Sequence, residues 1–149
     1  MHAIALALIL VPSLPADTRR ILDAADGVEL ISLDPKRIDA EAKDQGFHGY
    51  KPLGKTSLKR KADRAKLLKA LYKGIDDSDG TVAGCFNPSH GIRAKSGGKT
   101  VELVICYQCC SMTVHLDGKA SGVLTTPSPS KLFNSILADA KVPLPKQAE

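Results

Sequence analysis

The stretch of sequence that decides the fold runs from Gly80 to Asp117 and reads GTVAGCFNPSHGIRAKSGGKTVELVICYQCCSMTVHLD. It contains all four cysteines of the chain and two of its four histidines. Gly97 and Gly98 separate two apolar runs, and glycine supplies the positive φ angles that tight hairpin turns require. We therefore predict a β-hairpin whose turn lies at residues 96–99.

The segments on either side of this turn alternate between apolar and other side chains. From Val101 to Ile105 every second residue is a branched apolar one, and a period of two predicts a strand with one face on a core. Residues 112–117 and 82–86 show the same alternation. We therefore predict three adjacent antiparallel strands that form a meander. In this arrangement the face away from the core would carry Cys85, Cys106 and His115.

Two short segments resemble a family of short, uncharacterised exported bacterial proteins. They are CFNPSHG (85–91) and ICYQC (105–109), which match a C-F-x-P-x-H-G element followed by a hairpin ending in I-C-x-x-C. The resemblance extends to FHGYKPLGKTSL (47–58) and LFNSILADAKVPL (132–144). The chain departs from the family pattern at Ser89, at Tyr107-Gln108 and at the additional Cys110. The resemblance implies export and a single compact domain, and it brings no established activity.

The N-terminus has the composition of a signal peptide. A nine-residue apolar run from Ala3 to Val11 is too short to span a bilayer but has the length of a signal-peptide core. Cleavage is expected after Ala16, although a buried first strand or helix is the alternative. We therefore expect residues 1–16 to be removed and the protein to be periplasmic or secreted. No later segment is long enough to span a membrane.

The remaining chain, residues 17–149, has the composition of one globular domain, with 43% apolar and 25% charged residues over the whole sequence. Hydrophobic periodicity and turn residues predict the elements outside the meander. These are a helix from Asp17 to Gly27, a strand at 28–33 stopped by Asp34-Pro35, an edge strand at 47–53, a helix at 57–73, a loop at 121–130 and a helix at 130–140. The order predicts an α+β fold in which helices cover one face of an antiparallel sheet.

The predicted helix at 57–73 has a strongly basic face. Residues 51–73 contain nine basic residues and one acidic residue, for a net charge of +8, whereas the whole chain has +5. Such a stripe could meet an anionic partner. No aromatic residue is interleaved with it and no nucleic-acid motif accompanies it, which argues for a solvated helix face and against nucleic acid. The residues that would contact an anionic partner are Lys59, Arg60, Arg64, Lys66 and Lys73.

Four residues of the central stretch, spaced Cys-x4-His-x15-Cys-x2-Cys, are candidate metal ligands. Thiolate and imidazole groups are the ligands that tetrahedral zinc prefers, so a zinc site is one hypothesis. The alternative is a disulfide, with Cys85 paired to Cys106 or Cys109, because oxidising compartments preserve such bonds. In either case we expect one cluster formed by Cys85, His90, Cys106 and Cys109.

The chain contains no Gly-rich phosphate loop, no GxSxG elbow and no HExxH helix. We therefore assign no catalytic residue, and no cofactor other than the hypothetical zinc. The leading hypothesis is a small exported binding or structural domain whose Cys/His cluster fixes the hairpin. The alternative is a thiol redox or metal-dependent enzyme that uses Cys106, Cys109 and His90. A low-pKa thiolate needs a helix N-terminus or a nearby cation. The C-Y-Q-C segment ends a predicted strand and does not open a helix, which weakens the redox alternative.

Overall fold

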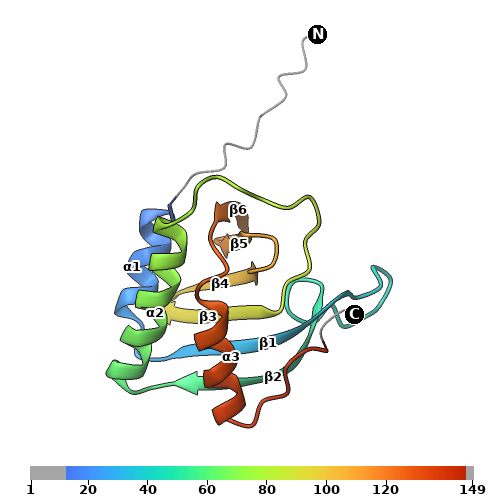
Figure 1. Ribbon diagram of the computed structural model, residues 1–149. Helices are drawn as coiled ribbons and strands as arrows, with labels where there is room; N and C mark the ends of the chain where they lie inside the picture. Colours follow the sequence, from blue (N-terminus) through green and yellow to red (C-terminus); the bar gives the residue numbers. More distant parts are fainter. Residues whose placement is uncertain (1–12, 147–149) are drawn as a thin grey trace.

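The computed structural model of the protein describes residues 13–146, which form one antiparallel sheet and three helices (Figure 1). The apolar run from Ala3 to Val11 lies outside the described residues. The helices are α1 (Ala16–Ala24), α2 (Lys61–Asp76) and α3 (Ser130–Asp139). The strands are β1 (Val28–Arg37), β2 (Tyr50–Leu58), β3 (His90–Ser96), β4 (Lys99–Cys106), β5 (Ser111–Leu116) and β6 (Lys119–Leu124). Their order across the sheet is β2-β1-β3-β4-β5-β6.

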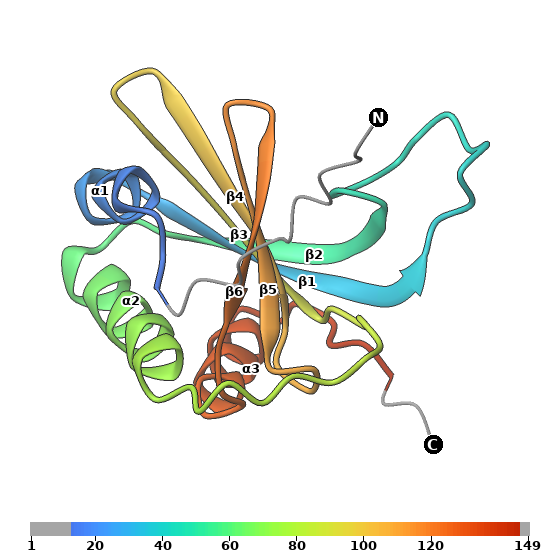
Figure 2. The same cartoon turned by 90° about the horizontal axis from the view of Figure 1, so that it is seen from above.

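All three helices pack on one face of this sheet (Figure 2). Alternate strand residues point toward them, and Leu30, Ile92 and Leu103 are fully buried in one core with Leu71 of α2 and Phe133 of α3. The burial of these side chains removes apolar surface from water and is the main term that stabilises the arrangement. The predicted fold class, a single α+β domain with helices on one face of an antiparallel sheet, is therefore confirmed.

A smaller apolar cluster covers part of the opposite face. It contains Ile31, Val104, Phe47 and Tyr50, with Phe86 packed against it. The ring of Phe47 lies directly over Gly91, where an added Cβ would come within 2.8 Å of Phe47 Cε1. A side chain at position 91 would therefore push the ring, and with it the loop of residues 38–49, away from the sheet.

The predicted hairpin is confirmed. β3 and β4 are joined at Gly97 and Gly98, both of which have positive φ angles, and Ser96 pairs with Lys99. The predicted alternation also holds, because Val101 and Ile105 lie in the core under the helices. The hairpin register is continuous over its full length, which places the beginning of β3 beside the end of β4.

Two predictions around the meander were wrong. Residues 82–86, expected as a strand, form an irregular loop. Gly84 and the following Asn87-Pro88 disfavour a strand here, because glycine weakens a strand and Pro88 has no N–H to donate to a neighbouring strand. Residues 119–124, largely expected as a loop, form β6. Asp117 and Gly118 both have positive φ and make a tight turn back from β5, a signal typical of a two-residue hairpin.

The bounds of β1, β2 and α2 also differ from the prediction. β1 continues past Asp34-Pro35, because Pro35 lies beyond the ladder with β3 and in an irregular part of the ladder with β2. Leu58, expected on the helix, pairs with Val28 and extends β2. Helix α2 runs past Gly74, which does not have the positive φ of a helix-ending glycine. The glycine instead allows a close approach, since a Cβ there would lie 2.6 Å from Pro129 Cγ.

Candidate functional site

The open end of the β3–β4 hairpin holds the residues that the sequence singled out. His90 begins β3 and is paired with Ile105, and Cys106 is the last residue of β4. Directly paired residues point to the same side of a sheet, whereas neighbours along a strand point to opposite sides. Since Ile105 belongs to the core under the helices, His90 faces the helices and Cys106 faces the other side.

The imidazole of His90 is buried between the sheet and α3. Its Nε2 lies 2.7 Å from Oδ1 of Asn134, and its ring packs edge-on against Phe133 with centroids 5.7 Å apart. Burial lowers the pKa of His90, and the hydrogen bond to Asn134 only partly opposes this effect. The ring is therefore neutral at pH 7. With Nε2–H donating to Asn134, Nδ1 is left as an acceptor, and it has no partner among residues 13–146.

The phenol of Tyr107 is a second buried polar group near His90. The side chain is 4% exposed, and the centroids of the Tyr107 and His90 rings are 5.5 Å apart. Burial raises the pKa of Tyr107 well above its usual value, so the hydroxyl stays protonated. This hydroxyl also has no hydrogen-bond partner within the described chain. Buried polar groups without a partner are rare in folded proteins, because each costs about 1–3 kcal/mol.

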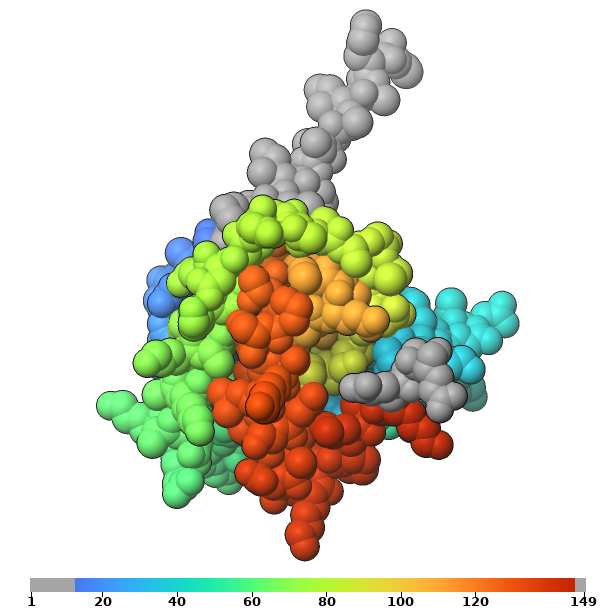
Figure 3. All heavy atoms as spheres, in the orientation of Figure 1, coloured from blue at the N-terminus to red at the C-terminus, as the bar shows by residue number. Residues whose placement is uncertain are grey.

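Both groups line one cleft, which has a volume of ≈ 610 Å³. The walls come from the end of β1, the loop before β3, the turn after β4, the start of α3 with the residues before it, and the C-terminal segment. Figure 3 shows the surface hollowed at this place, beside α3 in red. We call it the His90 cleft, lined by Pro35, Lys36, Asn87, Ser89, His90, Tyr107, Gln108, Pro127, Ser130, Asn134, Leu144, Pro145 and Lys146.

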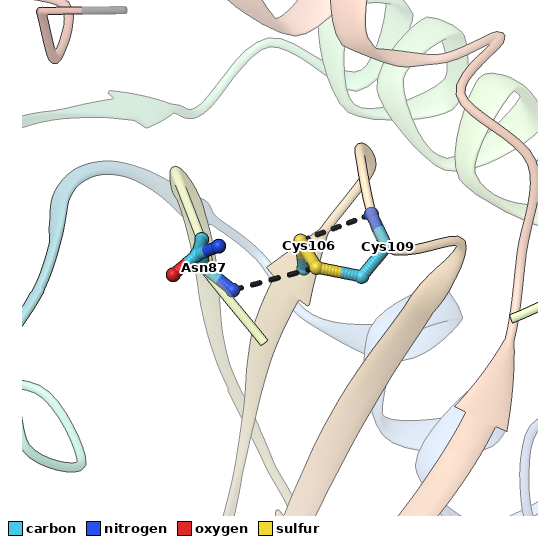
Figure 4. The surroundings of a disulfide bond; sticks show 3 residues. All are labelled: Asn87, Cys106 and Cys109. Carbon is cyan, nitrogen blue, oxygen red and sulfur yellow. Dashed lines mark hydrogen bonds between the residues drawn. A yellow bond between two sulfur atoms is a disulfide. The ribbon is translucent and has the colours of Figure 1, made fainter. Parts of the chain in front are cut away.

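A disulfide between Cys106 and Cys109 closes the turn that carries Tyr107 and Gln108 (Figure 4). The two Cα atoms are 5.1 Å apart, and both residues are buried, with exposed fractions of 0% and 1%. The backbone N–H of Asn87 donates to Sγ of Cys109 at 3.4 Å, which ties the loop before β3 to the turn. The disulfide thus holds one wall of the His90 cleft in place.

The structure confirms a disulfide but not the expected pairing. Cys85 was expected to pair with Cys106 or Cys109, whereas those two pair with each other and Cys85 is an exposed free thiol. The physical reason is that residues 82–86 form no strand, so no ladder brings Cys85 to the face of Cys106. His90 faces the helices and Cys106 the other side. Within residues 13–146 no three His, Cys, Asp or Glu residues gather as metal ligands.

This burial of the disulfide does not favour the thiol redox alternative. Thiol–disulfide exchange begins with attack on a sulfur atom, so the sulfur has to be accessible. Cys106 and Cys109 are both closed off from solvent. Cys110 is free and half-buried, and its positive φ of 60° marks the bend between the turn and β5.

The basic residues of the predicted partner surface lie on and just before α2. Some of them are neutralised locally: Arg60 Nε is 2.7 Å from Asp63 Oδ2, and Lys73 Nζ is 2.6 Å from Asp77 Oδ2. Such exposed pairs contribute little to stability. An anionic partner for this surface stays a prediction. In the described part of the chain no helix is long and apolar enough to cross a membrane.

A second polar cluster, which sequence reasoning did not identify, crosses the face opposite the helices. Glu29, Arg93, Glu102 and His115 are paired in turn on β1, β3, β4 and β5. Arg93 contacts both carboxylates, with Nη1 3.2 Å from Glu29 Oε2 and Nε 2.7 Å from Glu102 Oε2. At the β2 end, Lys55 Nζ lies 3.2 Å from Glu29 Oε1.

His48, from the loop before β2, completes this cluster. Its Nε2 is 3.1 Å from Glu102 Oε1, and its ring stacks on that of His115 with centroids 3.7 Å apart. Burial, and then the nearby charge of His48, lower the pKa of His115. Burial raises the pKa of Glu102, but Arg93 and His48 outweigh it, so the pKa lies below its usual value. We call these residues the charged row: Lys55, Glu29, Arg93, Glu102, His48 and His115.

Comparisons of the chain with family models, with curated proteins and with solved structures found no match.

Proposed function

We propose that the protein is a small exported, non-catalytic binding domain that holds a small polar molecule in the His90 cleft. The observation that carries the proposal is that two residues lining this one cleft, His90 and Tyr107, each hold a buried polar atom without a partner, Nδ1 and the hydroxyl. A bound molecule that hydrogen-bonds to both atoms would remove the cost of leaving them unpaired.

The composition of the cleft supports binding over catalysis. Its two serines, Ser89 and Ser130, are the only hydroxyl nucleophile candidates other than Tyr107 among the lining residues. A base that activates a serine has to reach its hydroxyl. Nε2 of His90 is instead hydrogen-bonded to the side-chain amide of Asn134, and neither serine is hydrogen-bonded to the imidazole. A neutral, fixed imidazole next to an amide and a phenol is suited to recognising hydrogen-bonding groups.

Export is supported by three features of the sequence and the fold. The apolar run before Ala16 has the length of a signal-peptide core. The Cys106–Cys109 disulfide is typical of oxidising compartments. The CFNPSHG and ICYQC segments resemble a family of exported proteins, and membership of that family is part of the proposal. Expression with the native N-terminus should yield a mature protein that begins at Asp17, and intact Met1 or His2 would contradict export.

The binding proposal can be tested by titrating ¹⁵N-labelled mature protein with separate sugars, polyols, amino acids, carboxylates and sugar phosphates. At least one compound should bind with a Kd of about 1 mM or lower, shifting the side-chain amide of Asn134 and the imidazole of His90 in a saturable manner. If no compound in this panel shifts either group, the His90 cleft is not a binding site for small polar molecules.

A matched pair of variants locates the binding. Tyr107→Phe removes the hydroxyl in the cleft and should weaken the best binder by about tenfold, the value of one lost hydrogen bond of roughly 1.4 kcal/mol. Tyr72→Phe makes the same change on α2, where the hydroxyl donates to Asp23 at 2.6 Å outside the His90 cleft. Its affinity should equal that of the wild type. Equal weakening by both variants would contradict binding in the cleft.

A further inference from the structure

We infer that the molecule bound in the His90 cleft is a small hydroxylated anion, a carboxylate or a phosphate ester such as a sugar acid or a sugar phosphate. This inference rests on the proposed function and adds the chemical class of the ligand. Four observations about the cleft support it: the charge of its lining, the start of α3, the two unpaired polar atoms, and the difference in depth between charged and neutral groups.

The lining of the His90 cleft contains two lysines, Lys36 and Lys146, and no aspartate or glutamate. Both lysines are exposed, whereas His90 and Tyr107 are buried. The cleft is therefore positive at its rim and neutral inside. A cationic ligand would find no counter-ion in this lining, whereas an anionic group at the rim would be attracted by both lysines.

The first turn of α3 borders the cleft. Ser130, its first residue, and Pro127 line the cleft, and Asn134 lies one turn further on the same face. The N-cap residue is Pro129, which has no side-chain acceptor, and no acidic residue occupies the first turn. The amide of Ser130 donates to Pro127 and that of Phe133 to Pro129. This leaves the amides of Lys131 and Leu132, which a side-chain cap would normally bond.

An uncapped helix start with no acidic side chain favours a negatively charged group, because the free N–H groups and the helix dipole both attract it. Two residues of the same lining, His90 and Tyr107, hold unpaired buried polar atoms, so the helix start is not the sole indication of a ligand. Ser130, the first residue of α3, lines the cleft together with Lys36 and Lys146, so the positive end of the helix dipole and both lysines act on the same cleft.

The two buried atoms, His90 Nδ1 and the Tyr107 hydroxyl, indicate which uncharged group the ligand carries. Nδ1 of His90 is an acceptor, and the Tyr107 hydroxyl can donate or accept. A hydroxyl on the ligand satisfies both kinds of partner, since it can donate to one atom and accept from the other. A charged group is excluded from the same depth, because burying an unpaired charge is far more costly than burying a hydroxyl. The anionic group therefore lies at the rim and the hydroxyl inside.

The test is a calorimetric titration of the full mature protein with glucose, gluconate, glucose 6-phosphate and inorganic phosphate. The first three share a hydroxylated skeleton and differ in charge. At least one of the two charged sugars should bind about tenfold or more tightly than glucose at low salt, and this advantage should shrink as salt screens the lysines. Whether gluconate or glucose 6-phosphate binds better distinguishes a carboxylate from a phosphate ligand.

A double variant tests the role of the rim. Lys36→Gln with Lys146→Gln should bring the affinity for the charged sugar down to about that for glucose measured with the same variant. The matched control is Lys95→Gln with Lys119→Gln, two exposed lysines next to the hairpin turns and outside the cleft lining. This control should retain the preference for the anion.

The possible failures are distinguishable. If glucose binds as tightly as gluconate and glucose 6-phosphate, the anionic class is wrong while the proposed binding function stands. If inorganic phosphate binds as tightly as glucose 6-phosphate, the buried hydroxyl contact is wrong. If these four compounds and the wider panel all fail to bind, the proposed function itself is wrong.

Discussion

The charged row and His90 lie on opposite faces of the same sheet. The polar groups of the charged row have partners, whereas two buried polar groups of the His90 cleft have none within the described residues. In the charged row Arg93 contacts two carboxylates, and Glu102 also receives His48. In the cleft two buried polar atoms have no partner within the described residues. A polar cluster whose members satisfy one another is explained by the fold alone. The unpaired buried atoms of His90 and Tyr107 are the observation on which we base the proposed ligand, because an unpaired buried polar group carries an uncompensated cost.

The largest effect is expected from removing the disulfide that holds the cleft wall. Cys106→Ser with Cys109→Ser should lower the free energy of unfolding by roughly 2 kcal/mol, the chain-entropy value for so short a closed loop. Urea denaturation measures this change. Nuclear magnetic resonance should show altered shifts at Tyr107 and Gln108 but not at Arg93.

The control for this prediction is Cys85→Ser with Cys110→Ser, which removes the two free thiols and should change stability by less than about 0.5 kcal/mol. A chelator should have no effect on the wild type. Destabilisation by a chelator, together with four free thiols in the purified protein, would instead favour the zinc alternative.

The next largest effect on stability is expected in the charged row. Glu102→Gln keeps the shape of the side chain but removes the charge that bonds Arg93 and His48, and should lower stability by about 1 kcal/mol. Chemical denaturation at pH 7 measures it. Glu41→Gln, an exposed acid on the loop before β2, is the matched control and should be neutral. A neutral Glu102→Gln would show that the charged row contributes nothing to stability.

In the His90 cleft, removing a polar group should raise stability and not lower it. Tyr107→Phe removes a buried hydroxyl without a partner, so the ligand-free protein should become more stable by about 1 kcal/mol. The measurement is thermal and urea unfolding beside Tyr72→Phe, which loses a hydrogen bond to Asp23 and should not gain stability. If Tyr107→Phe is destabilised, its hydroxyl has a partner in solution and the central argument for the cleft fails.

The smallest effect is a pH dependence that links the two regions. The pKa values of His90 and His115 are both lowered, chiefly by burial. Below the ordinary histidine pKa of 6.5 the unfolded chain takes up protons that the folded chain does not, so stability falls as the pH falls. Glu102, whose pKa is also lowered, adds a further loss below its ordinary value of 4.5.

Urea denaturation at pH 7.5 and pH 5.5 should therefore show lower stability at the acidic value. His115→Gln removes one of the two contributions and should reduce this difference by less than about 1 kcal/mol, since a full proton is worth about 1.4 kcal/mol per pH unit. A difference that is unchanged in His115→Gln would mean that His115 is not shifted in the folded protein.

Much of the architecture could be predicted because its signals are local. The Gly97-Gly98 turn, the alternation after Val101 and the periodicity of α3 each depend on a few neighbouring residues. Strand bounds were less predictable: Leu58 fits a helical stripe equally well until its pairing with Val28 is known. β6 contains only two strongly apolar residues, Val123 and Leu124, and its one clear signal is the Asp117-Gly118 turn.

The candidate site was predicted only in part. The sequence located it at the open end of the hairpin and named His90, Cys106 and Cys109, but it paired the wrong cysteines. Nothing in the sequence distinguishes Asn134 from a surface asparagine of an amphipathic helix. It becomes part of the site because α3 packs across the start of β3, which places Asn134 Oδ1 next to His90.

The amino-acid sequence by itself determined the hairpin, the fold class and the cysteine-rich turn, because turn residues and hydrophobic periodicity act over short distances along the chain. Only the tertiary structure decided which polar groups meet. A shift of one residue in register would turn Glu102 and His115 toward the helices and His90 away from them. That register depends on the whole sheet and on the helices that cover it, so the paired row and the unpaired cleft emerge only when the chain is folded.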